Sequence, residues 1–176
     1  MENQLSPQPQ SAASVLDEGK LYQYKEMLRL EQNMPLALLA GVAAAVIGAV
    51  LWAIITVATN LQIGYMAVGL GFLVGYTVRF AGKGFDQAFG ILGAGLALCG
   101  CLLGNLFSLV GFIAEDEGLG YMQVLLGIDY SVVPQVMIAT FSPIDLLFYG
   151  LAIYEGYRFS FRQVSEAEIL ANAAKF

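Results

Sequence analysis

Long apolar runs that carry almost no charge dominate this sequence, and the first of them, residues 36–58, contains no charged residue. As a helix, such a run is long enough to cross a hydrocarbon core of about 30 Å at about 1.5 Å per residue. Charged residues make up only 12% of the chain, and the mean hydropathy is +0.69. A soluble domain carries about twice that charged fraction. The sequence therefore predicts an all-α, polytopic membrane protein.

We predict four transmembrane helices, at residues 36–58, 64–81, 88–113 and 143–161. The first two are joined by a very short uncharged turn and should be antiparallel neighbours. The one long loop, residues 114–141, has apolar stretches interrupted by Asp129 and Pro134. We expect it to form one or two interfacial or re-entrant helical pieces outside the cytoplasm. A fifth span is the alternative, but it would have to include both interrupting residues.

The membrane domain, residues 35–164, is flanked by polar segments at both ends. Residues 1–14 are rich in Gln, Ser and Pro, which is typical of a disordered tail. Residues 15–34 have an amphipathic pattern and predict a cytoplasmic helix, either on the membrane surface or solvated beside it. Residues 165–176 form a short cytoplasmic tail.

Glycines recur at the same intervals of seven, four and seven residues in the second and third predicted spans. Steps of seven and four return to one side of a helix, so each span carries a bare stripe on which another backbone can pack closely. An inverted duplication would produce the same pattern, although the match outside the glycines is poor. The helix-packing glycines are Gly64, Gly71, Gly75 and Gly82, and Gly93, Gly100, Gly104 and Gly111.

The distribution of charge predicts the orientation. With four spans, all eight basic residues fall on one side of the membrane and the acidic cluster Glu115-Asp116-Glu117 falls on the other. Because basic residues are retained in the cytoplasm, both termini are expected there. The basic residues are Lys20, Lys25, Arg29, Arg79, Lys83, Arg158, Arg162 and Lys175.

Glu155, within the fourth predicted span, is the most informative single residue. A carboxylate in a span costs about 2–3 kcal/mol unless it is paired or hydrated. We expect an ion pair with Arg79 or Arg158 that fixes the register of the helices. A proton- or cation-coupled site is the second interpretation, and an acid that reaches the membrane interface is the third.

Three further polar residues are assigned to helix contacts and helix ends. The Asn105 amide should form a hydrogen bond across to another helix, near Asn60 or Gln62, with a polar pathway as the alternative. Ser142 and Asp145 have the spacing of an N-cap and an N3 residue at the start of the fourth span. The tyrosines that follow, Tyr149, Tyr154 and Tyr157, are interpreted as packing residues.

The sequence predicts no catalytic residues, no metal site and no cofactor. It contains no histidine, and its two cysteines, Cys99 and Cys101, should lie on opposite faces of one helix. The acidic cluster lacks the alternating ligands of a calcium loop, and no basic patch for nucleic acid is present. The expected partners are the lipid bilayer and either a second copy of the chain or another membrane protein.

The segment from Ile63 to Arg79, IGYMAVGLGFLVGYTVR, resembles a family of small, uncharacterised bacterial inner-membrane proteins. In these a tight turn leads into a glycine-rich span that ends in arginine, followed by a second glycine-rich span. The resemblance covers roughly the first three spans, implies a bacterial inner membrane and implies no activity. Four-span multidrug exporters differ, because they need a glutamate in their first span, where this chain has no charge.

From these observations we expect a non-enzymatic, structural or assembly component of the membrane. The alternative is a small transporter or channel-like protein that uses Glu155 and Asn105. A membrane-bound enzyme ranks third, because the sequence contains no recognisable pair of nucleophile and base.

Overall fold

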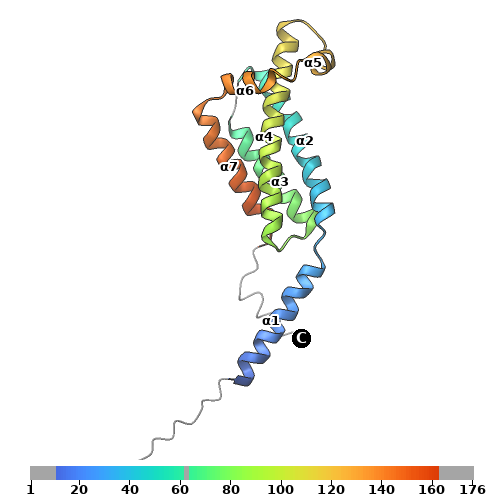
Figure 1. The fold of residues 1–176 in the computed structure, drawn as a ribbon, viewed down its shortest axis with the longest axis vertical. Coiled ribbons are helices and arrows are strands. Elements are labelled where there is room, and N and C mark those ends of the chain that lie inside the picture. Colours follow the sequence, from blue (N-terminus) through green and yellow to red (C-terminus); the bar gives the residue numbers. More distant parts are fainter. Residues whose placement is uncertain (1–10, 62–63, 163–176) are drawn as a thin grey trace, which may run out of the picture. The chain divides into compact units, whose positions relative to one another are not determined.

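The computed structural model describes residues 11–61 and 64–162, and all regular structure within them is helical. This confirms the all-α prediction. The seven helices of these residues (Figure 1) are α1 (Ser11–Leu30), α2 (Met34–Thr59), α3 (Tyr65–Gly82), α4 (Gln87–Asp116), α5 (Tyr121–Gly127), α6 (Val133–Thr140) and α7 (Pro143–Phe159).

Helix α1 belongs to a unit separate from the one formed by residues 33–162. It begins at Ser11, so residues 11–14, which the composition assigned to a tail, are helical. The remaining predicted tail segments, residues 1–10 and 165–176, lie outside the described residues, as does Gln62.

Three helices of the described chain, α2, α3 and α4, are long and apolar enough to cross a membrane. Helix α7 is 17 residues long, and it passes the same test only together with α6, from which it is bent by 107°. The structure therefore has three candidate spans, or four if this bent pair forms one span. The helices agree closely with the predicted spans, except that α4 extends into the acidic cluster and ends at Asp116.

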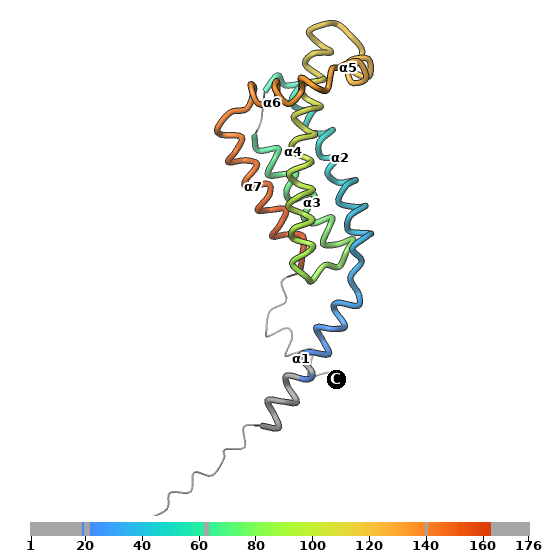
Figure 2. The backbone as a smooth tube through the Cα atoms, in the orientation of Figure 1, coloured from blue at the N-terminus to red at the C-terminus, as the bar shows by residue number. Residues whose placement is uncertain are grey.

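Helices α3 and α4 form the centre of the unit made by residues 33–162 (Figure 2). Helix α2 packs against both of them on one side, and α7 packs against both on the other. Within the described residues, no backbone segments of α2 and α7 approach each other closely. The hairpin of glycine-rich helices is therefore shared by both flanking helices, and Phe89, Val74 and Val78 are among its fully buried side chains.

The glycines allow α7 to lie directly against the backbones of α3 and α4. A Cβ atom added at Gly71 would lie 2.6 Å from the carbonyl oxygen of Ala152. One added at Gly156 would lie 2.7 Å from the carbonyl oxygen of Gly93, and Gly93 in turn faces Ser160. Neither contact leaves space for a side chain. This agrees with the prediction that the glycines form bare stripes on which another backbone packs closely.

The other glycines of the pattern meet several different neighbours. Gly75 also faces α7, at Phe159 and the carbonyl of Glu155, whereas Gly104 and Gly111 face Trp52 and Val57 of α2. The remaining three, Gly64, Gly82 and Gly100, lie against Phe148, against Ala37 and Phe89, and against Leu70, respectively. The two stripes therefore serve several helix contacts rather than one.

The turn between α3 and α4 holds both ends of this unit by backbone hydrogen bonds. The N–H of Asn33, at the start of α2, donates to the carbonyl of Gly82 at 2.9 Å. The N–H of Arg162, after α7, donates to the carbonyl of Gly84 at 2.7 Å. Lys83 between them has φ of 48°, a left-handed conformation that ends α3. We call this end of the unit the turn end.

At the opposite end, which we call the loop end, residues 114–141 contain the two short helices α5 and α6. Val124 of α5 is buried against Val110 and Ala114 of α4. The acidic residues Glu115, Asp116 and Glu117 are exposed here. Acidic and basic side chains of residues 33–162 thus concentrate at different ends, because Arg79, Lys83, Arg158 and Arg162 lie toward the turn end.

The glycine contacts predict opposite results for neighbouring glycines of one helix. Gly71→Ala and Gly93→Ala should each lower the free energy of unfolding by about 1–3 kcal/mol, because the added methyl group overlaps α7. Gly69→Ala and Gly95→Ala are matched controls with nothing within 4 Å, and each should leave stability unchanged or raise it by up to about 1 kcal/mol. Unfolding by SDS in mixed micelles measures all four variants, and equal losses in both pairs would contradict this packing.

Candidate functional site

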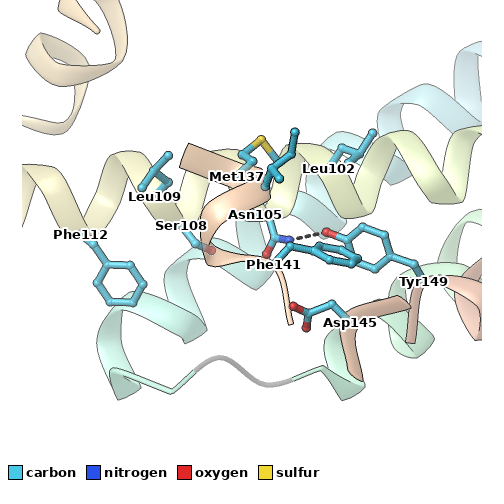
Figure 3. A pocket seen from close by; sticks show the side chains of 10 residues that line it. Leu102, Asn105, Ser108, Leu109, Phe112, Met137, Phe141, Asp145 and Tyr149 are labelled. Carbon is cyan, nitrogen blue, oxygen red and sulfur yellow. Dashed lines mark hydrogen bonds between the residues drawn. The ribbon is translucent and has the colours of Figure 1, made fainter. Parts of the chain in front are cut away.

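A pocket of about 270 Å³ lies between α4, α6 and α7 at the loop end (Figure 3). Most of its wall is apolar, and its polar groups are the side chains of Asn105, Ser108, Asp145 and Tyr149. The apolar lining consists of Leu102, Leu109 and Phe112 of α4, Met137 and Ile138 of α6, and Phe141.

The polar part of the pocket is organised by a hydrogen bond between two helices. The amide Nδ2 of Asn105 donates to the hydroxyl oxygen of Tyr149 on α7 (Figure 3). Asn105 therefore bonds across to another helix, as predicted. The partner is Tyr149 rather than a group near Asn60, and Gln62, the other residue named for this region, lies outside the described residues. Asn60 is the left-handed C-cap of α2, and its N–H donates to the carbonyl of Val57.

Tyr149 is a residue whose polar role the sequence analysis missed, because it was interpreted as packing. Its side chain is only 7% exposed, so its hydroxyl group needs a partner within the protein. The position of each residue along its helix is the sequence signal that could have identified the pair. Asn105 lies in the second half of a helix that ends at the loop end, and Tyr149 lies in the first half of one that starts there.

Asp145 has two roles in the structure. Its Oδ2 accepts a hydrogen bond of 2.8 Å from the backbone N–H of Ser142, as expected for an N3 residue that caps a helix. The same carboxylate also lines the pocket, which the sequence analysis did not predict. The cap thus fixes the position of the one charged side chain in the pocket wall.

Glu155 lies on α7 closer to the turn end, and its Oε2 atom is buried without a hydrogen-bond partner. A Cβ atom on Gly75 would lie 3.1 Å from the carbonyl oxygen of Glu155, so this part of α7 packs tightly on α3. A buried polar atom without a partner is costly. Glu155 is therefore the second candidate for a functional group.

The expected ion pair of Glu155 is not formed within the part of the chain that the structure describes. Arg158 donates from Nη1 to the hydroxyl of Tyr154 at 2.6 Å, and its guanidinium lies 5.8 Å from the centre of that ring. Arg79 lies one helical turn beyond Gly75 toward the turn end, whereas Glu155 is level with Gly75.

Three serine and threonine residues of the described chain are buried, namely Thr56, Ser108 and Ser160. Ser160 donates from its Oγ to the carbonyl of Gly156. Ser108 lines the pocket and donates to the carbonyl of Gly104 at 2.8 Å, so its hydrogen-bonding capacity is used within α4. Thr56 of α2 is fully buried, and its Oγ1 has no hydrogen-bond partner among the described residues.

The described residues contain no group of three or more His, Cys, Asp and Glu side chains that is arranged to bind a metal ion. Cys99 is exposed and Cys101 is buried, which confirms that they lie on different faces of α4. The comparison of the chain with protein-family models, characterised proteins and solved structures gives no match.

The hydrogen bond between Asn105 and Tyr149 predicts a specific energetic coupling. Asn105→Leu and Tyr149→Phe should each lower the free energy of unfolding by about 0.5–1.5 kcal/mol. Because both remove the same bond, the double variant should lose about 0.6 kcal/mol less than the sum of the two. Tyr65→Phe is the control, since Tyr65 is exposed. Strictly additive losses in SDS unfolding would show that the bond contributes no stability.

Proposed function

We propose that this chain is a four-span integral membrane protein with a structural role, as an assembly component of the membrane rather than as an enzyme. The observation that supports it best is the direct backbone packing of α7 on α3 and α4, at Gly71, Gly93 and Gly156. Helices in such contact have little freedom to move, which suits a rigid scaffold. Its partners are the lipid bilayer and a second copy or another membrane protein.

The length of contact between α7 and α3 supports the fourth span. Phe148, near the start of α7, lies against Gly64 at the start of α3. Arg162, just after α7, bonds to Gly84 just after α3. Helix α7 therefore runs beside the whole of α3, over about 26 Å for 17 residues at 1.5 Å per residue. A bilayer that α3 crosses would be crossed by α7 as well.

The proposed orientation places the turn end in the cytoplasm of a bacterial cell, and residues 1–10 and 163–176 on the same side. It is supported by the basic residues at the turn end and the acidic residues Glu115 to Glu117 at the loop end. Retention of basic residues in the cytoplasm explains this separation. The bacterial inner membrane itself rests on the family resemblance of the first three spans.

Cysteine labelling of intact cells tests both the fourth span and the orientation. In a background with Cys99→Ser and Cys101→Ala, single cysteines are introduced as Lys83→Cys, Asp116→Cys and Arg162→Cys. A membrane-impermeant maleimide should label position 116 in intact cells, and positions 83 and 162 only after permeabilisation. Labelling of position 116 only after permeabilisation would contradict the proposed orientation and indicate the opposite one. Labelling of positions 83 and 162 from opposite sides of the membrane would contradict the proposal that α7 forms a fourth span.

A second candidate function, transport of protons or cations, is favoured by the buried Oε2 of Glu155, which has no partner. An acid inside a span that is not used in an ion pair is a functional candidate by default. In this alternative, Asn105 would contribute to the polar path at the loop end, because its side chain lines the pocket there.

Glu155→Gln separates the two functions. For a structural protein, the variant should melt at the same temperature or higher, because it replaces a carboxylate whose Oε2 atom is buried without a partner, and ion flux into proteoliposomes should not change. For a transporter, the variant should stay folded and lose at least about tenfold in flux, since a glutamine cannot carry the proton. Glu117→Gln, at an exposed position, is the control. Exchanging the two residues, as Glu155→Arg with Arg79→Glu, should not recover any stability that the single variants lose, because Glu155 and Arg79 do not form an ion pair.

A further inference from the structure

We propose that the pocket between α4, α6 and α7 binds an amphipathic organic cation, that is, a quaternary or protonated amine that carries a small apolar group. This inference goes beyond the structural role and does not depend on it. It rests on three properties of the pocket: its size, its single charge and its aromatic wall.

The size and the apolar wall limit the ligand to a small molecule with an apolar body. The pocket volume of about 270 Å³ is at the lower end of ligand sites, which measure about 300–1,000 Å³. Leu109 of α4 and Met137 of α6 supply part of the apolar surface. A single ring or a short branched chain fits this description, whereas a large polar metabolite does not.

The charge of the pocket selects a cation. Asp145 is the one acidic residue that lines the pocket, and no lysine or arginine lines its wall. Its Oδ2 is held by the N–H of Ser142, so the carboxylate is fixed in place before any ligand arrives. An anion would be repelled by this carboxylate, and a neutral apolar ligand would leave it with its bond from Ser142 but without a counter-ion.

Aromatic rings beside the carboxylate favour an ammonium group in particular. The rings of Phe141 and Tyr149 are in edge contact, with centroids 5.8 Å apart, and Phe112 lines the same pocket. Figure 3 shows the carboxylate of Asp145 on the same side of the pocket as the rings of Phe141 and Tyr149. Aromatic faces attract cations within about 6 Å of the ring centre, and amines that carry methyl groups are bound in this way.

The ligand can enter without opening the helix core. Phe141 is 40% exposed and Ile138 is 76% exposed, so the wall formed by α6 and the segment after it faces outward. On the other side, Tyr149 and Ser108 are buried and close the pocket toward the core. A cation would therefore reach Asp145 from the loop end of the helices.

Binding of benzyltrimethylammonium tests the proposal directly, with neopentylbenzene as an uncharged probe of the same shape. Equilibrium dialysis compares nanodiscs that contain the full-length protein with empty nanodiscs of the same lipid. We expect the cation to bind the protein at least about tenfold more tightly than the uncharged probe, as a desolvated cation–aromatic contact beside a carboxylate predicts. Equal binding of both probes would show a merely apolar cavity and overturn the proposal.

Substitutions assign the binding to this pocket. Asp145→Asn should weaken binding of the cation about tenfold or more, and Phe141→Leu about threefold or more, with little effect on the uncharged probe. Asparagine at position 145 still accepts the bond from Ser142, so an unchanged melting temperature checks the fold. Asp116→Asn, outside the pocket, should change nothing. Full binding by Asp145→Asn, or an equal loss with Asp116→Asn, would overturn the proposal.

Discussion

The direct contact of backbones between α7 and the hairpin of α3 and α4 is the interaction on which the rest of the structure depends. In hydrocarbon, apolar side chains gain nothing by leaving lipid for protein, so helices associate through close packing and a few hydrogen bonds. Glycine supplies that packing here, because Gly71 meets Ala152, and Gly93 meets Gly156, with no side chain between them. Neighbouring glycines of the same helices, such as Gly69 and Gly95, meet nothing. The contact is therefore a property of particular positions rather than of glycine content.

The polar groups of α7 take their positions from this contact. Once the helix is seated, Tyr149 reaches Asn105, and Asp145 closes the pocket wall beneath α6. Glu155 is held level with Gly75, one turn away from Arg79, so the two charges do not meet. The same packing thus gives the buried Tyr149 hydroxyl a partner and leaves the buried Oε2 atom of Glu155 without one, so each of the two candidate sites includes a polar group of α7.

Most of the fold could be predicted from the sequence, because it follows from local patterns. Apolar runs, the Asn33 cap and the Ser142–Asp145 cap define the helices, and the spacing of glycines identifies their contact faces. The partner of Asn105, and the lack of a partner for the Oε2 atom of Glu155 among the described residues, could not be predicted. A partner across two helices depends on their relative register, which is set by both packed surfaces together and is not visible in either helix alone. Helix α4 extends to Asp116, beyond the predicted end at residue 113, because the acidic residues of its last turn were interpreted as the start of a loop.

The two bonds that the turn between α3 and α4 accepts have a consequence for the way in which the protein is made. A chain is synthesised from its N-terminus, so Asn33 can join Gly82 as soon as α3 and α4 are present. Until α7 has been made, the strip of Gly71, Gly75 and Gly93 has no helix packed on it. The bond from the N–H of Arg162 to the carbonyl of Gly84 can form only after residue 162 has been synthesised, so the contacts of α7 are the last of this unit to be completed.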